Sequence, residues 1–456
     1  MRSPSIFTTV IVALGFLVAA RAAEAGRPEA IALVAGDLHS AYDRTAQFVA
    51  RVDRVRAENP GVPLAVLLDG DTFELGNAVA LRSGGAIEFA MFRALAERAP
   101  TVLNLGNHEP EFFDLAETVA RIRTTGVTVI GGNAIDRATG KNFAPATARV
   151  KLGAHELTLV GVTTDKLSTY RLAIRPQLDL ADPVVWAKQN FPTLLKSAAL
   201  PVVLSHAGLR ADRAMFPLVP DGALFAGAHD HLRFVHREGR TVYFHSGSWM
   251  ECLSVARLHH TAVGLQWSVE QIPLAAGDPA DPTLAKLIRE TLARHLTPEE
   301  TATVGRAPRA LAPGDAALLA VEAARVAAGA DAAFVGATTF GAGLPAGAVS
   351  RFAFDACVRF DGTLFVGEVD GVQLKKILAR ANQGPATPFA ERGGENLIAA
   401  VAPALLAQIE PARRYRLATT DWVAKNAASY LGENPPALTE RPDLKLKAAA
   451  LAALNR

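Results

Sequence analysis

The sequence predicts an α/β layered sandwich, and three observations indicate this class. Short apolar runs recur from Pro28 onward, with helix-like segments between them. Most of these runs end in a glycine or a polar turn, as strands do. Of the 456 residues, 50% are hydrophobic and 20% charged, which fits a globular protein with a sizeable core. The length allows two or three domains.

The strands and helices of the first part follow from these runs. The predicted strands are, in chain order, Ile31–Ala35, Leu64–Leu68, Thr101–Leu105, Val127–Ile130, Leu157–Val162, Pro201–Leu204, Ala223–Ala226 and Thr241–Phe244. The predicted helices are Ala41–Glu58, which ends at Asn59-Pro60-Gly61, then Gly85–Arg98 and Asp114–Thr124.

A change of composition separates a second part of the chain. Residues 275–282 are rich in Ala, Asp and Pro, as linkers are, and a helix is predicted from Pro282 to His295. Beyond it the sequence predicts an Ala-rich helix and another strand–helix alternation. These elements are helix Gly314–Ala328, strand Ala332–Val335, strand Gly362–Val369 and helix Gly371–Ala381.

The N-terminus has the pattern of a secretory signal peptide. Arg2 supplies the positive charge, Ile6–Ala20 is a nearly unbroken apolar run, and Ala23–Ala25 is a small-x-small cleavage site. A membrane anchor is the alternative, but the run is shorter than the roughly 20 residues that span a bilayer. We therefore expect cleavage after Ala25, a periplasmic or secreted protein, and no stable membrane anchor.

Charge and cysteine content limit the remaining classes. The formal net charge is only +2, so no basic surface indicates a nucleic-acid partner. Export would permit a disulfide, yet the only two cysteines, Cys252 and Cys357, lie about a hundred residues apart. Two separate thiols are the expected state.

Side chains that bind metals follow the predicted strands. The seven candidates are Asp37, His39, Asp71, Asn107, His206, His229 and His231. Their oxygen and imidazole donors suit hard or borderline divalent ions. Any one of these histidines is more often a core or surface residue than a ligand. Seven ligands in this order are too many for one ion and indicate two ions that share a carboxylate, roughly 3.5–4 Å apart.

The order of these motifs resembles that of the calcineurin-like metallophosphoesterases, specifically the exported bacterial 5′-nucleotidases. The motifs are Asp-x-His at 37–39, Gly-Asp at 70–71, Gly-Asn-His-Glu at 106–109, Ser-His at 205–206 and His-x-His at 229–231. The resemblance covers nearly the whole mature chain. It implies an N-terminal four-layer αββα sandwich and a smaller C-terminal α/β domain that binds the substrate. The implied division is a signal peptide at 1–25, a metallophosphoesterase domain at 28–273, a linker and connecting helix at 274–296, and the C-terminal domain at 297–456.

The same resemblance implies roles for individual residues. Asp37, His39 and His231 would hold one ion, Asn107, His206 and His229 the other, and Asp71 would bridge them. The metals would be Mn, Zn or Fe, and a metal-bound hydroxide would attack a phosphate ester, with a nucleotide as the expected substrate. His108 would be the catalytic histidine that stabilises the phosphoryl group and the leaving oxygen.

Several positions depart from the family pattern. Pro110-Glu111 stands where Phe-Asp is usual, so Glu111 is the candidate to orient His108. Ala228 replaces a glycine, and the stretch 72–77 is one residue longer than usual. The usual Asn-Ser-Gly-Gly-Ile-Arg reads Ala337–Ala342 here, without the arginine.

The substrate pocket is therefore the least typical part. Phe360 and Tyr430 stand where base-stacking aromatics are expected, and Arg351 and Arg359 are candidate substitutes for the missing cation. Either ring could equally be a core aromatic. Two other functions stay open: a related hydrolase of a non-nucleotide ester, such as a thiosulfohydrolase or a general phosphatase, and a non-catalytic binding protein.

Overall fold

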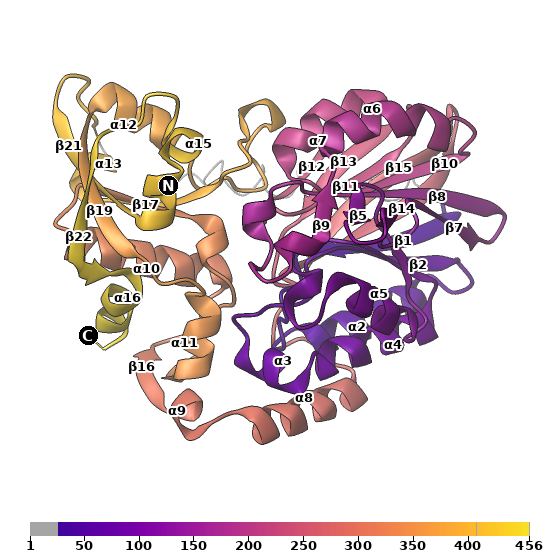
Figure 1. The fold of residues 1–456 in the computed structure, drawn as a ribbon, viewed down its shortest axis with the longest axis horizontal. Coiled ribbons are helices and arrows are strands. Elements are labelled where there is room, and N and C mark those ends of the chain that lie inside the picture. The colour runs from indigo at the N-terminus through magenta and orange to yellow at the C-terminus, as the bar shows by residue number, and fades with distance from the viewer. Residues whose placement is uncertain (1–25, 407, 456) are drawn as a thin grey trace, which may run out of the picture.

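The computed structural model of the protein describes residues 26–406 and 408–455. The predicted signal peptide at 1–25 lies outside the described residues. Two six-stranded sheets form the N-terminal part, and a five-stranded sheet forms the C-terminal part (Figure 1).

The first sheet has the order β15-β14-β1-β2-β3-β4. Strands β1 to β4 run parallel, β14 is antiparallel to β1, and β15 is antiparallel to β14. The bounds are β1 Ala30–Gly36, β2 Leu64–Asp69, β3 Thr101–Asn104, β4 Thr128–Ile130, β14 Cys252–Thr261 and β15 Gly264–Pro273. β1 and β2 are buried along their whole length, which explains why they read as unbroken apolar runs.

The second sheet has the order β12-β13-β11-β10-β8-β7, with parallel central strands and antiparallel edges. The bounds are β7 Thr147–Leu152, β8 His155–Thr163, β10 Leu200–His206, β11 Leu224–Gly227, β12 Arg233–Glu238 and β13 Thr241–Ser246. A small sheet β6-β5-β9 lies apart from it. Its strands are β5 Ala134–Asp136, β6 Lys141–Asn142 and β9 Leu178–Leu180.

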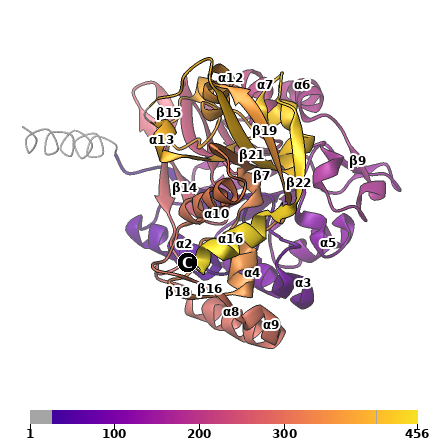
Figure 2. The ribbon, with the colours of Figure 1, turned by 90° about the vertical axis from the view of Figure 1, so that its left-hand side faces the viewer.

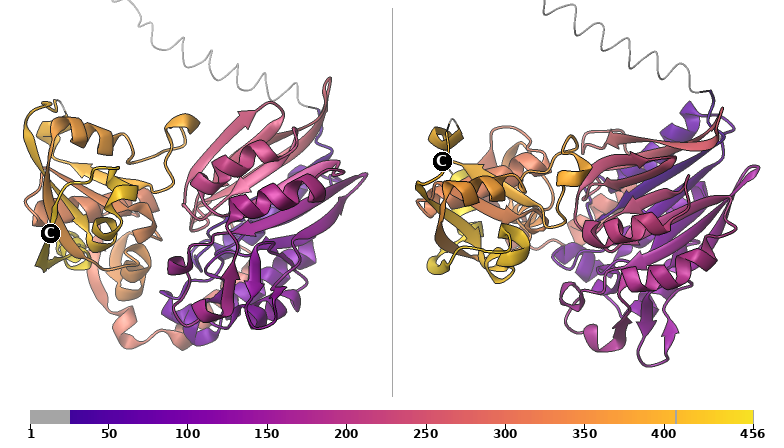
Figure 3. Two further views of the ribbon diagram at one scale, coloured as in Figure 1. Left: turned by 45° about the horizontal axis from the view of Figure 1, so that its top comes forward. Right: turned by 90° about the horizontal axis from the view of Figure 1, so that it is seen from above.

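The two large sheets pack face to face, and helices cover their outer faces. One apolar cluster joins side chains of both sheets, including Val34, Leu67, Leu204 and Phe244. The helices on the first sheet are α2 Thr45–Glu58, α3 Ala78–Ser83, α4 Ala86–Arg98 and α5 Leu115–Arg123; those on the second are α6 Pro183–Leu194 and α7 Leu209–Met215. Figure 3 shows this stacking, which confirms the predicted four-layer αββα sandwich.

A helical connection leads to the C-terminal part. α8 Pro282–His295 begins at Asp281, whose side chain accepts a hydrogen bond from the Leu284 amide at 2.7 Å, and it packs against α3 and α4. The short α9 Pro298–Thr301 follows.

The C-terminal part is a sheet of order β20-β17-β21-β19-β22 with helices on both faces (Figure 2). The strands are β17 Ala332–Gly336, β19 Thr363–Asp370, β20 Leu397–Val401, β21 Arg414–Thr420 and β22 Leu438–Lys445, and β16 Thr303–Ala307 pairs with β18 Gly347–Ser350. The helices are α10 Pro313–Ala327, α11 Arg351–Cys357, α12 Gly371–Leu378, α13 Pro403–Leu406, α14 Asp421–Lys425, α15 Ala427–Leu431 and α16 Leu446–Leu454. Two separate cores occupy the two faces, as the alternation of buried residues along β17 requires.

The structure differs from the sequence prediction at a few elements. The first helix begins at Thr45 rather than Ala41, because residues 41–44 form a turn in which the Arg44 amide donates to the Ala41 carbonyl at 2.9 Å and Arg44 itself has non-helical φ and ψ. The β14–β15 hairpin was not predicted, although it completes the first sheet.

Two sequence expectations concern cysteines and the membrane. Cys252 and Cys357 are free and buried, as expected. Within residues 26–406 and 408–455, no helix has the length and apolar character needed to cross a bilayer.

Candidate metal centre

Five strand ends converge on one edge of the sandwich and carry the predicted ligands. Asp37 and His39 follow β1, Asp71 follows β2, and Asn107 follows β3. His206 is the last residue of β10, and His229 and His231 follow β11. Since β1 to β3 belong to one sheet and β10 and β11 to the other, the site lies across the seam between the two sheets.

The ligand atoms of these residues lie close together. Nε2 of His39 is 2.9 Å from Nε2 of His231, and Nε2 of His206 is 3.0 Å from Oδ2 of Asp71. Potential ligand atoms form groups in which all members lie within 4.8 Å of one another. The groups are Asp37–His39–His231, Asp71–His206–His229 and His39–Asp71–His108. Asp71 belongs to the second group and, together with His39 of the first group, to the third, so it joins the two groups as a shared ligand would.

Asn107 completes the set. Its side chain is buried, and its Nδ2 donates to the Thr169 carbonyl at 3.3 Å. Its Oδ1 is buried and has no hydrogen-bond partner among the described residues. A buried acceptor without a partner is costly unless something else coordinates it, so this oxygen fits a cation.

The backbone at the site is strained. Asp37, His39, Asp71, His229 and His231 all have positive φ, between 48° and 79°, although none is glycine. Such conformations cost on the order of 1–3 kcal/mol each and cluster at functional sites. The folded structure thus holds these side chains in place at the expense of local stability.

The protonation states of three imidazoles suit metal binding. Burial lowers the pKa of His39 to about 4 and that of His229 to about 3, and it lowers the pKa of His231 as well. These imidazoles are therefore neutral near pH 7, which is the form that binds metals. For Asp71, burial would raise the pKa, but His206 and His108 outweigh it and lower the pKa well below its usual value. For His206, burial would lower the pKa, but Asp71 outweighs it and raises the pKa well above its usual value, and burial raises the pKa of Asp37.

Polar contacts on the far side of two rings orient their Nε2 atoms. His206 Nδ1 is 2.7 Å from the Asp69 carbonyl oxygen, which leaves Nε2 directed at Asp71. His39 Nδ1 lies 3.3 Å from Oε2 of Glu74. Contacts of this kind fix the tautomer and ring orientation of metal-binding histidines. The donor set and its supports fit two divalent cations.

His108 is close to the candidate ligands and is paired with Glu111. Its Nδ1 is 2.6 Å from Oε1 of Glu111, and its Nε2 is 4.0 Å from Oδ2 of Asp71. Burial would lower the pKa of His108, but the two carboxylates outweigh it and raise the pKa to about 9. The ring is thus held as a proton donor at the edge of the centre.

Glu109 has a structural role that the sequence did not predict. This buried carboxylate accepts hydrogen bonds from the amides of Gly106 at 2.6 Å, Thr72 at 2.9 Å and Asp71 at 3.0 Å. It therefore ties the turn after β2 to the turn after β3. Its place in the Gly-Asn-His-Glu motif was the only available signal.

Glu74 and Trp249 were also missed. Trp249 stacks on His39, with ring centroids 5.5 Å apart and planes 21° apart. Glu74 is buried and contacts both His39 and Arg359. No motif marks either residue in the sequence.

The predicted substrate residues lie in different surroundings. Phe360 is 52% exposed, and the Arg359 guanidinium lies 4.9 Å from its ring. Tyr430 is buried in the C-terminal core, and its hydroxyl accepts a hydrogen bond from Trp422 Nε1 at 3.2 Å. Arg359 is buried in an ion pair with Glu74.

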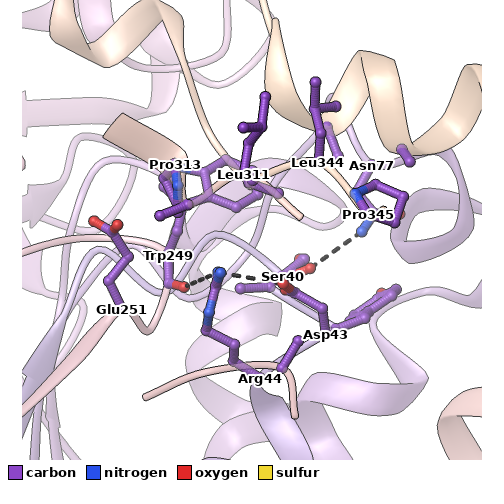
Figure 4. A pocket seen from close by; sticks show the side chains of 18 of the residues that line it. Ser40, Asp43, Arg44, Asn77, Trp249, Glu251, Leu311, Pro313, Leu344 and Pro345 are labelled. Carbon is purple, nitrogen blue, oxygen red and sulfur yellow. Dashed lines mark hydrogen bonds and ion pairs between the residues drawn. The ribbon is translucent and has the colours of Figure 1, made fainter. Parts of the chain in front are cut away.

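A cavity of about 750 Å³ lies where the N-terminal and C-terminal parts meet. Figure 4 shows Arg44 and Glu251 on one side of it and Leu311 and Leu344 on the other. Its lining includes Glu74, Trp249 and Arg359 but none of the seven candidate ligands, so it is a neighbour of the metal centre and not the centre itself.

Comparisons with known families agree with this geometry. The calcineurin-like phosphoesterase family matches residues 32–233, and the 5′-nucleotidase C-terminal domain matches residues 300–433. Together they account for well over half of the chain. No curated protein matches the sequence significantly.

Similar solved structures span both parts of the chain. A 5′-nucleotidase precursor from Thermus thermophilus is 17% identical, with a TM-score of 0.58 over 93% of this chain and 96% of that one. The sulfate thiohydrolase SoxB of Thermus thermophilus is 18% identical, with a TM-score of 0.58 over 91% and 80%. A 5′-nucleotidase from Candida albicans is 12% identical, with a TM-score of 0.58 over 95% and 99%. At these identities the likeness establishes the fold.

The two family matches and the shared fold lead to one conclusion. The chain belongs to the calcineurin-like metallophosphoesterases of the 5′-nucleotidase family and is a dimetal phosphoric ester hydrolase.

Proposed function

We propose that this enzyme hydrolyses nucleotides to nucleosides and phosphate outside the cytoplasm. The observation that carries the proposal is the position of Asp71, which belongs to one group of ligand atoms, is grouped with His39 of the other, and lies 4.0 Å from Nε2 of His108. The 5′-nucleotidases among the similar structures support the choice of substrate.

The first group would hold one ion through Asp37, His39 and His231. Asn107, His206 and His229 would hold the other, and Asp71 would bridge the two. The ions would be Mn, Zn or Fe, since neutral imidazoles and carboxylates suit all three. When bound, such a pair activates water and neutralises charge on phosphoryl oxygens.

The protein's own residues supply the remaining steps. Glu111 holds the proton of His108 at Nδ1, because the two atoms lie 2.6 Å apart. The opposite nitrogen, Nε2, is then free to donate a hydrogen bond to a phosphoryl oxygen or to the leaving oxygen. We assign His108 as the catalytic residue and Glu111 as the residue that positions it.

The nucleoside would be held by the C-terminal part. The exposed ring of Phe360 offers a stacking face. Arg359 and Tyr430 lie near each other because both contact Thr338: Arg359 Nη1 donates to its carbonyl, and the Tyr430 hydroxyl contacts its side chain. Aromatic stacking tolerates any base.

A non-nucleotide ester is the second candidate, for a specific reason. Arg359 is a predicted substitute for the missing cation, and its charge is already neutralised by Glu74. A nucleotide would therefore meet less positive charge here than the family pattern provides. The fold likeness to SoxB is compatible with this alternative.

The signal-peptide pattern predicted at residues 1–25 supports the proposed location. The test of the location is fractionation of the cells that make the protein. The substrate is tested with the purified mature chain, dialysed against chelator and then given Mn²⁺. AMP, p-nitrophenyl phosphate and a thiosulfate ester should be compared at equal concentrations. Nucleotide hydrolysis should dominate and require metal. Exclusive hydrolysis of the thiosulfate ester would replace the proposed substrate, and no hydrolysis at all would favour a binding protein.

A further inference from the structure

Two side chains, those of Glu74 and Trp249, contact the His39 ring away from its Nε2 atom. Oε2 of Glu74 lies 3.3 Å from Nδ1 of His39, and the Trp249 ring stacks on the imidazole at 5.5 Å. The opposite nitrogen, Nε2, faces His231 at 2.9 Å. The direction of Nε2 therefore depends on Glu74 and Trp249.

Arg359 contacts both of these supports. One of its Nη atoms forms an ion pair with Oε2 of Glu74, the same oxygen that faces His39. Its guanidinium also lies 5.2 Å from the Trp249 ring, within the range of a cation–π contact. The side chains of Glu74 and Arg359 are each only 4% exposed, so solvent screens their interaction little.

These contacts join two distant parts of the molecule. Glu74 and Trp249 belong to the N-terminal sandwich, whereas Arg359 follows α11 in the C-terminal part. Gly341 of the C-terminal part also fits against Trp249: a Cβ at this position would lie 2.5 Å from Cζ2 of the tryptophan. The C-terminal part therefore touches both residues that support His39.

The two carboxylate oxygens of Glu74 have different partners. Oε1 of Glu74 accepts a hydrogen bond from the Gly76 amide at 2.9 Å, within the same turn. For Oε2, the described partners are His39 and Arg359. Without Arg359, this buried carboxylate would lose the cation that compensates its charge.

We propose that Arg359 is a positioning residue through which docking of the C-terminal part sets the affinity of the Asp37–His39–His231 position for its metal ion. Arg359 holds Glu74 and Trp249, and these two hold the His39 ring in its metal-binding orientation. The inference deepens the proposed function, since it rests on a divalent ion binding at these three residues. It concerns metal affinity and so is independent of which ester is hydrolysed.

The test measures Mn²⁺ binding, with the electron paramagnetic resonance signal of free Mn²⁺ as the readout. The variants are Arg359→Met, which removes the charge, and Glu74→Gln, which keeps the side-chain size. Each should weaken one of two Mn²⁺ sites by about 10- to 100-fold, as loss of a supporting partner does, and leave the other within about threefold. The double variant should lose little more than either single one, because both act through one contact.

Two further variants sharpen the test. Arg359→Lys keeps the charge but not the planar guanidinium, so it should restore only part of the affinity. Arg309→Met is the matched control, because it breaks an exposed Arg–Asp pair in the same C-terminal part and should leave both sites unchanged. Circular dichroism and thermal unfolding of each metal-free variant show whether it folds. If Arg359→Met does not fold, Glu74→Gln and Arg359→Lys still test the inference.

The outcomes separate this inference from the proposed function. Unchanged Mn²⁺ binding in Arg359→Met, with only a higher KM, would overturn the inference and make Arg359 a substrate contact. Equal weakening of both sites would also overturn it. Two intact Mn²⁺ sites in a wild-type protein that hydrolyses no ester would refute the proposed function and leave the inference standing. A wild-type protein that binds no Mn²⁺ would overturn both.

Discussion

Oε1 of Glu111 lies 2.6 Å from Nδ1 of His108, three residues earlier in the chain. The short 3-10 turn Glu109–Glu111 makes this contact possible, because it folds the chain back directly after the imidazole. Pro110, within that turn, favours such a conformation. The carboxylate that reaches the histidine therefore lies two residues beyond Glu109, the Glu of the Gly-Asn-His-Glu motif.

This contact predicts graded effects on turnover. His108→Ala should lower kcat by roughly 10²- to 10⁴-fold, since it removes the proton donor. Glu111→Gln should cost about 10- to 100-fold, because the imidazole remains but loses its orienting charge. Bound metal, measured by atomic emission, should stay at the wild-type level in both. Loss of metal from His108→Ala would instead make His108 a ligand.

A second prediction concerns Asp71. Because Asp71 lies between both ligand groups, Asp71→Asn should lower the content of both ions together and abolish activity. Asp221→Asn is the control, since Asp221 forms an exposed ion pair with Arg240 and is not one of the candidate ligands. Metal analysis after gel filtration measures the number of ions bound per chain in both variants. Retention of two ions per chain in Asp71→Asn would contradict a bridging role.

Gly106 allows a third prediction from packing. A Cβ here would overlap Oδ1 of Asp71 and lie 2.6 Å from the Asp71 amide nitrogen. Gly106→Ala should therefore displace Asp71, reduce metal binding and destabilise the fold by about 1–3 kcal/mol, the usual cost of overpacking. Gly277→Ala is the matched control, because nothing lies within 4 Å of its added methyl group. Thermal unfolding with and without Mn²⁺ measures both effects; equal behaviour of the two variants would show that the site can accommodate the methyl group.

The fourth prediction concerns substrate choice. If Phe360 stacks on a base, Phe360→Ala should cost roughly 1–3 kcal/mol of binding. KM for AMP should then rise about 10- to 100-fold. KM for p-nitrophenyl phosphate should change little, because this small ester cannot reach both parts of the protein. Phe360 is 52% exposed, so the substitution should leave the melting temperature nearly unchanged.

Tyr430 is buried, so its test needs a conservative substitution beside the alanine variant. Tyr430→Ala should raise KM for AMP in the same way but also lower stability, whereas Tyr430→Phe should preserve the ring and the KM. Equal losses on AMP and p-nitrophenyl phosphate in the Phe360 and Tyr430 alanine variants would mean that both rings are structural. The nucleotide proposal would then fall, while the phosphoesterase assignment would stand.

Much of the N-terminal sandwich could be predicted from local patterns. Strands β1 and β2 read as apolar runs because both of their faces are buried, and α4 and α5 end where the sequence predicts. The β14–β15 hairpin could not be predicted in this way. β14 mixes apolar, basic and histidine residues, and only its pairing with β1 shows that it belongs to the sheet.

The sequence by itself determined the order of the elements and the chemistry at the strand ends. Apolar runs, turn residues and short spacings such as Asp-x-His are local properties, and each can be read within a few residues. The tertiary structure alone decided which ligand atoms face one another and what supports them. Glu74 and Arg359 lie 285 residues apart in the chain, and neither belongs to a motif. They meet behind His39 only because the C-terminal part packs against the sandwich, a long-range contact that no local pattern encodes.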